Sequence, residues 1–157
     1  MQARNAGLVV LAAALTFVSA AAGTSTASKQ RVVITSKTGV DGFTLTPLTP
    51  GALGTDSGSF DSCCWGYRSL VRDGQDVIVN DHDRRTLKGK RGTLVLRFHN
   101  EWTDAGSGYT IGVSTWRVVS GTRAYKGVTG GGRAATVWLH PPRGPAGFQA
   151  EGFLTSK

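Results

Sequence analysis

The sequence predicts a single all-β domain, an antiparallel barrel of about eight strands, and three observations carry this prediction. From Arg31 onward the apolar residues alternate with a period of about two, and no segment shows a sustained helical stripe with caps. Glycine supplies 22 of the 157 residues, roughly twice its average share, which favours short strands joined by tight turns. Barrel closure also removes exposed sheet edges, which suits a small chain without helices to cover them.

The first residues are predicted to be a secretory signal peptide. Arg4 precedes an uncharged apolar run at 6–22, and small residues offer cleavage points between Ala20 and Ala27. An uncleaved membrane anchor is the alternative, but this Ala-rich run is at the short limit for a bilayer span. We therefore expect a secreted protein. The expected segments are a leader at 1–22, a flexible lead-in at 23–30 and the barrel domain at 31–157.

Strands are expected where β-branched and aromatic residues alternate with polar ones between turn formers. Pro47 and Pro50 end the second strand, and the stretch at 51–59 is expected to be a loop with nothing to bury. The stretch at 84–92 is expected to be a basic connection. The predicted strands lie at 31–37, 42–48, 60–71, 76–80, 93–102, 109–119, 133–139 and 148–155.

A glycine-rich phrase overlaps the end of the strand at 109–119. It reads WRVVSGTRAYKGVTGGG over 116–132. Its glycines allow a sharp chain reversal, and Trp116 and Tyr125 are expected to plug one barrel end. Gly130–Gly132 are expected to form a bulge or a flexible lead into the next strand. A phosphate-cradling loop is the alternative, but Arg133 and a strand follow instead of the required Lys-Ser/Thr and helix.

This phrase and the strands around it resemble the allene oxide cyclase-like and dirigent-like barrel superfamily, in particular its small secreted bacterial members. The resemblance implies an eight-stranded antiparallel barrel with a central apolar cavity, often assembled as a homo-oligomer. In the plant members it implies the steering of cyclisation or coupling of a reactive hydrophobic intermediate. Arg123 departs from the family phrase, which commonly has a glycine there. No position matches a catalytic motif of the family, so no site residue is carried over.

The strand predicted at 93–102 holds the candidate catalytic residues. Its side chains alternate between Leu94, Leu96 and Phe98 on one face and Arg97, His99 and Glu101 on the other. On a cavity wall, His99 and Glu101 would act as base and acid, and Arg97 would stabilise a negative oxygen. The alternative is a solvated outer face. We expect that arrangement, because each apolar side chain turned inward contributes roughly 1.5–3 kcal/mol.

Charge is concentrated in the middle of a chain whose formal net charge is +8. The stretch 81–85 is expected to be an exposed loop. A basic patch would attract polyanions such as envelope polymers, but specific nucleic-acid binding is not expected, since no aromatic residue lies between Tyr67 and Phe98. The three histidines lack metal-ligand spacing, so neither a metal nor a cofactor is expected. The candidate polyanion-binding residues are Arg84, Arg85, Lys88, Lys90 and Arg91.

Cys63 and Cys64 are the only cysteines and are adjacent. In an extended strand their side chains point to opposite faces, which excludes an ordinary disulfide between them. Three interpretations stay open for an oxidising compartment: a vicinal disulfide, two thiols with one buried, or a bond between molecules.

Three classes of function remain. The first is non-catalytic binding of a hydrophobic small molecule, or a cell-surface accessory role. It is favoured because no catalytic set of residues can be recognised in the sequence. The second, implied by the resemblance, is a cyclase-like, isomerase-like or dirigent-like protein. The third is a cell-envelope polyanion binder. The candidate ligand-binding aromatic residues are Trp65, Tyr67, Phe98 and Trp102.

Overall fold

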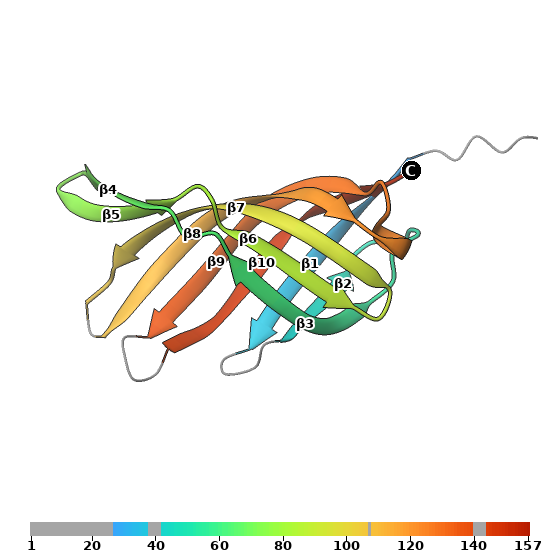
Figure 1. Cartoon of the computed structure of the whole chain (residues 1–157), viewed down its shortest axis with the longest axis horizontal. Coiled ribbons are helices and arrows are strands. Elements are labelled where there is room, and N and C mark those ends of the chain that lie inside the picture. Colours follow the sequence, from blue (N-terminus) through green and yellow to red (C-terminus); the bar gives the residue numbers. More distant parts are fainter. Residues whose placement is uncertain (1–26, 38–41, 107, 140–143) are drawn as a thin grey trace, which may run out of the picture.

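Eight antiparallel strands close into a barrel, as the computed structural model shows for residues 27–37, 42–106, 108–139 and 144–157 (Figure 1). The barrel order is β7-β6-β3-β2-β1-β10-β9-β8, and pairing of β8 with β7 closes the ring. The all-β barrel expected from the sequence is therefore confirmed. The strands are β1 (Ser28–Lys37), β2 (Gly42–Pro47), β3 (Asp56–Cys63), β4 (Tyr67–Arg72), β5 (Gln75–Asn80), β6 (Arg84–Gly89), β7 (Gly92–Asp104), β8 (Tyr109–Gly121), β9 (Thr129–Leu139) and β10 (Gly144–Ser156).

Strands β4 and β5 lie outside this ring and extend it on one side. They form a hairpin around Asp73 and Gly74, and β5 pairs with the second half of β7, beyond the part that pairs with β6. The hairpin therefore projects past one end of the barrel (Figure 1).

The barrel interior is lined by apolar side chains because wall strands such as β7 alternate buried and accessible positions. In β7, Leu94, Leu96 and Phe98 are at most 1% exposed, and the intervening residues face outward. The expected orientation of this strand is thereby confirmed. The same core includes Val32 and Ile34 of β1.

The end of the barrel that faces away from the hairpin is closed by a short 3-10 turn, η1 (Arg123–Tyr125), and by the connection between β2 and β3. The Tyr125 hydroxyl donates to Asp56 Oδ2 at 2.9 Å. Gln30 donates to the Leu53 carbonyl and accepts from the Leu53 amide. Leu53 and Asp56 are 5% and 3% exposed, so the expectation that 51–59 has nothing to bury is wrong.

This end supports a prediction about alkaline stability. Burial, aided by the hydrogen bond to Asp56, raises the pKa of Tyr125 above its ordinary value. The neutral phenol is thus favoured in the folded state, and its contribution is lost as pH rises above about 10, where the unfolded phenol ionises. We expect the free energy of unfolding to fall more steeply above pH 10 in the wild type than in Tyr125→Phe. Denaturant titrations at several pH values test this. Equal slopes would contradict it, and Tyr109→Phe is the half-exposed control.

Gly152 of β10 makes room for a tryptophan, and the main chain of β8 and β10 comes close to the glycines at 130–132. They lie within regular β9 and form no bulge there, which corrects the sequence prediction. Trp116 is opposite Gly132 in register, and a Cβ on Gly152 would come within 2.7 Å of the Trp116 ring. The indole nitrogen donates to the carbonyls of Arg133 and Glu151. Trp116 is therefore held against the inner wall, and only Tyr125 plugs the barrel end.

Several boundaries differ from the predicted ones. β1 begins at Ser28, earlier than Arg31, because Gln30 already points into the closed end. The stretch predicted as a basic connection is largely strand β6, in which Arg85 and Leu87 face inward. The predicted strand at 60–71 is divided between β3 and β4. The leader at 1–22 and His140 lie outside the described residues.

Candidate functional site

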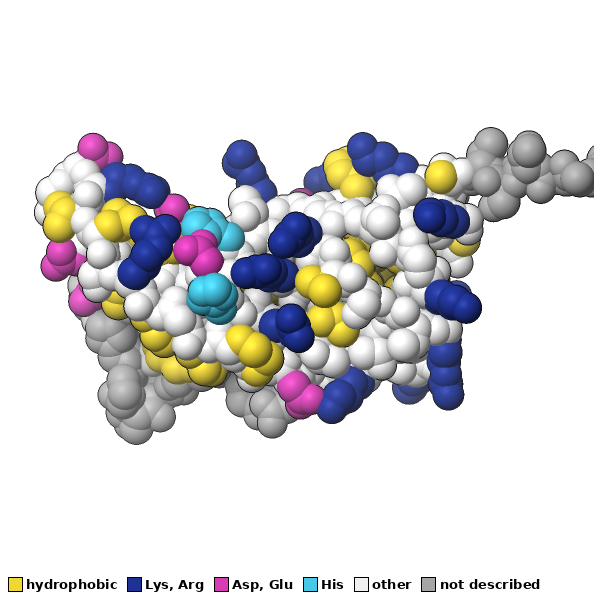
Figure 2. Space-filling view, turned by 45° about the horizontal axis from the view of Figure 1, so that its top comes forward, with side chains coloured by type: hydrophobic (Ala, Val, Ile, Leu, Met, Phe, Trp, Pro, Cys, Tyr) yellow, Lys and Arg dark blue, Asp and Glu magenta, His cyan; other side chains and the backbone are white. Residues whose placement is uncertain are grey.

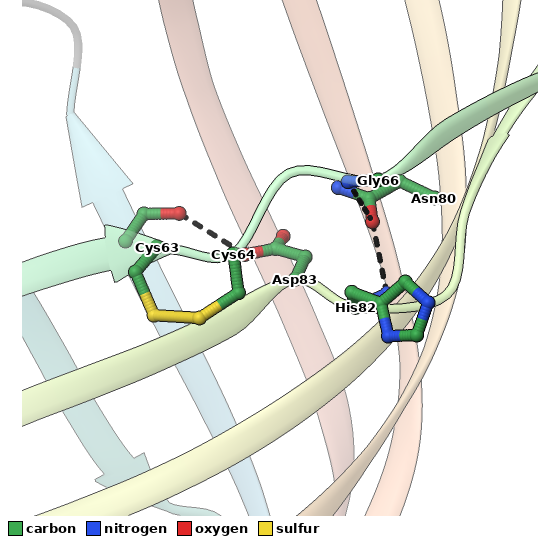
Figure 3. Close-up of a disulfide and its surroundings, with 7 residues drawn as sticks. Cys63, Cys64, Gly66, Asn80, His82 and Asp83 are labelled. Carbon is green, nitrogen blue, oxygen red and sulfur yellow. Dashed lines mark hydrogen bonds between the residues drawn. A yellow bond between two sulfur atoms is a disulfide. The ribbon is translucent and has the colours of Figure 1, made fainter.

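Two short interruptions between strands, called breaks below, lie side by side at the hairpin end of the barrel. The first separates β3 from β4 at 64–66, and the second separates β5 from β6 at 81–83. The pairs Cys63–Arg84 and Tyr67–Asn80 flank them. The Asn80 side-chain oxygen accepts from the Gly66 and His82 amides at 3.5 and 2.9 Å and so spans the gap (Figure 3).

The first break contains a vicinal disulfide. Cys63 and Cys64 are bonded to each other, and this decides among the three interpretations of the cysteines. Cys64 adopts a φ of 74°, in the left-handed region, so the strand cannot continue through it. Both cysteines are exposed, and Asp83 lies beside them in the neighbouring break (Figure 3).

The second break turns Asp83 into the barrel. Its carboxylate is fully buried and accepts from Ser62 Oγ at 3.0 Å, Arg85 Nε at 3.1 Å and Asn100 Nδ2 at 2.9 Å. Asn100 in turn accepts from Ser114 Oγ at 2.6 Å. These five side chains, Ser62, Asp83, Arg85, Asn100 and Ser114, are called the inner polar cluster. The expectation of an exposed loop at 81–85 is wrong for Asp83 and Arg85.

Arg85 is the cation of this cluster. Its side chain is 8% exposed and forms an ion pair with Asp83 through Nη2 at 3.1 Å. The guanidinium carbon lies 4.1 Å from the Phe98 ring centre and 4.6 Å from that of Phe148, so the charge is flanked by aromatic faces. Burial lowers the pKa of Arg85, whereas the charge of Asp83 opposes this effect. No acceptor for Nη1 is found among the described residues.

Two buried polar atoms near this end have no hydrogen-bond partner among the described residues. They are Asn80 Nδ2 and Thr136 Oγ1. Thr136 is 7% exposed and is the β9 residue opposite Phe148, one of the two rings that flank Arg85. An unsatisfied buried hydroxyl is costly, so this position is suited to a ligand oxygen.

The predicted catalytic residues Arg97, His99 and Glu101 lie on the outer wall. His99 Nδ1 contacts Asp81 Oδ1, and its Nε2 is 3.5 Å from Glu101. Arg72 forms a double hydrogen bond with Glu101 and lowers the pKa of that carboxyl. The hydrogen bond from His99 likewise lowers the pKa of Asp81. His99, Asp81, Glu101 and Arg72 form an ion-pair network outside the barrel, separated from its interior by the strand itself.

The four candidate ligand-binding aromatic residues are not brought together. Trp65 and Tyr67 stack on each other with ring centres 6.0 Å apart and are 54% and 60% exposed. Trp102 lies on the wall against Gly112. Only Phe98 reaches the inner polar cluster.

The five basic residues proposed for polyanion binding are also divided. Arg85 points into the barrel and Arg84 points outward. Lys88 pairs with Asp61, while Lys90 and Arg91 lie at the turn into β7. They do not form one patch.

The sequence analysis missed Asp83, Asn100 and Ser114 as functional candidates. Asn100 carried a usable signal, since it continues the inward series of Leu96 and Phe98 in a strand. The sequence around Asp83 gave no such signal, because the break that turns Asp83 inward depends on the pairing of both β5 and β6 with β7.

Among the described residues, no group of three or more His, Cys, Asp or Glu side chains could hold a metal ion. In the same part of the chain, no helix is long and apolar enough to cross a membrane. No family model, curated protein or solved structure matches the chain.

Proposed function

We propose that this protein is a secreted, non-catalytic binding protein for a hydrophobic small molecule that carries an acidic or carbonyl oxygen group. The ligand enters the hairpin end of the barrel and places its oxygen group against Arg85. The observation that carries this proposal is the Arg85 guanidinium, buried between Phe98 and Phe148.

The energetic cost of the inner polar cluster supports a binding role. Removing a carboxylate and a guanidinium from water costs several kcal/mol per ion, and well-packed apolar residues would be as stable or more stable. A buried pair of this kind needs another reason to exist, and ligand recognition supplies one. The aromatic rings match an apolar ligand body, and Arg85 Nη1 and Thr136 Oγ1 offer hydrogen bonds to its polar group.

The bonding of Asp83 favours binding over catalysis. Its carboxylate already accepts hydrogen bonds from Ser62, Arg85 and Asn100. Both of its oxygens are thus engaged by donors of the protein itself, so the carboxylate is poorly placed to remove a proton from a substrate. The cyclase-like alternative therefore takes second place, as a protein that holds the conformation of its ligand.

The resemblance to the allene oxide cyclase-like and dirigent-like barrels is part of this proposal. Arg123, which stands where the family phrase commonly has glycine, adopts a φ of 51°. This is the left-handed conformation that favours glycine, so the departure in sequence preserves the backbone turn.

Binding of two fluorescent probes tests the proposal. We expect 8-anilinonaphthalene-1-sulfonate, which is apolar and anionic, to bind the wild type. The double variant Asp83→Asn with Arg85→Met should bind it about 10-fold or more weakly, since a hydrogen bond to a charged group contributes about 1.5–3 kcal/mol. The neutral probe Nile red should bind both proteins similarly.

Lys126→Met is the control, because it removes an exposed cation next to η1 at the closed end of the barrel, outside the inner polar cluster. The double variant keeps the net charge of the wild type, so equal loss of the anionic probe in Lys126→Met and in the double variant would show that the loss is not specific to Arg85. That result, or unchanged binding by the double variant, overturns the proposal.

A further inference from the structure

Three arginines lie in one row across the outer wall of the barrel. Arg84 of β6 is directly opposite Arg97 of β7, and Arg97 is directly opposite Arg117 of β8. Each alternates with inward-facing neighbours, so all three side chains point outward. Directly opposite residues have Cβ atoms about 4.5–5.5 Å apart, and like charges at that spacing destabilise a sheet. We call these residues the arginine row.

No carboxylate neutralises the row. Among the described residues, none of the three arginines forms an ion pair. Asp81 lines the same hollow as Arg97 and Arg117, but its carboxylate is engaged by His99 and Arg68. Arg97 reaches only the main-chain carbonyl of Asp81, at 3.2 Å. The repulsion within the row is therefore uncompensated by the chain itself.

A hollow of about 330 Å³ lies beside the row. Its side walls are Asp81, Arg97, His99, Thr115 and Arg117, and its floor is the strand at Phe98 and Trp116, whose own side chains are buried. Figure 2 shows Lys and Arg side chains gathered on the middle of this face, beside two histidines. The hollow thus combines two guanidinium groups with the Thr115 hydroxyl.

We infer that Arg97 and Arg117 of the arginine row form, with Thr115, a binding site for a phosphate group on the outside of the barrel. Guanidinium groups donate paired hydrogen bonds to tetrahedral oxyanions, and two of them from neighbouring strands can share one phosphate. A bound dianion would also remove the repulsion among the arginines. This site is separate from the inner polar cluster, since the β7 wall lies between them.

Calorimetric titration with inorganic pyrophosphate at low ionic strength tests the inference. We expect Arg97→Gln and Arg117→Gln each to weaken binding about 10-fold or more, because each removes a charge-assisted hydrogen bond. Lys126→Gln is the matched control. It removes the same charge at the closed end of the barrel and should leave binding close to wild type.

Thermal unfolding provides a second readout. Without pyrophosphate, Arg97→Gln should melt at or above the wild-type temperature, since it relieves repulsion in the row. With pyrophosphate, the wild type should gain stability and Arg97→Gln should not. Absence of pyrophosphate binding, or equal weakening in Lys126→Gln, overturns the site.

Vesicles identify the source of the phosphate. If phosphatidylglycerol vesicles bind the wild type and lose binding in Arg97→Gln, the group belongs to a lipid headgroup. If pyrophosphate binds and the vesicles do not, it belongs to a soluble phosphate compound. Both results support the site, and phosphatidylcholine vesicles serve as the neutral reference.

Discussion

Asp83→Ala is expected to lower the free energy of unfolding by about 3–5 kcal/mol, because it leaves the buried Arg85 guanidinium without its counter-charge. Asp83 is fully buried and also holds Ser62 and Asn100. Urea titration followed by tryptophan fluorescence measures the change.

Two further variants separate charge from packing. Asp81→Ala, two positions away and half-exposed, should destabilise the protein far less, because exposed ion pairs contribute little to stability. Asp83→Asn with Arg85→Met should lose much less stability than Asp83→Ala, since it removes both charges. An Asp83→Ala protein as stable as Asp81→Ala would show that Arg85 is not confined in the barrel.

Trp116→Ala is expected to cost about 3–5 kcal/mol, the usual penalty for truncating a large buried aromatic side chain. Trp116 is 3% exposed, and its ring fills the space left by Gly152. Trp138→Ala, at a residue that is 42% exposed, is the control and should change the melting temperature far less. Equal shifts for the two variants would contradict the inner-wall position of Trp116.

The barrel wall could be predicted because alternation is a local property of each strand. In β7, inward and outward residues alternate without interruption from Leu94 to Asn100, and a slip by one residue would expose every core side chain. The orientation of Arg97, His99 and Glu101 followed from that constraint alone.

The inner polar cluster could not be predicted, because it depends on non-local pairing. β5 and β6 both pair with β7, and the residues between them turn Asp83 inward. A charged stretch such as 81–85 is locally indistinguishable from a solvated loop. Its burial is decided by Ser62 and Asn100, which belong to other strands.

The glycine-rich segment at 116–132 shows a further limit of prediction from the sequence. Glycine favours turns, but it also lets two strands or a large ring approach closely. Gly132 serves the second purpose, since a Cβ there would lie within 2 Å of the Glu151 carbonyl. Only the register of β9 with β10 distinguishes the two uses.

The pairing of β1 with β10 brings the first and last strands of the barrel side by side. Ser28 and Ser156 are register partners, so the chain enters and leaves the barrel at neighbouring points. This is the end closed by Tyr125 and Leu53, and Figure 1 shows it opposite the projecting hairpin. A tether, tag or support joined to the chain at Ser28 or at Ser156 therefore holds the barrel at its closed end. The inner polar cluster and the vicinal disulfide then face away from the point of attachment.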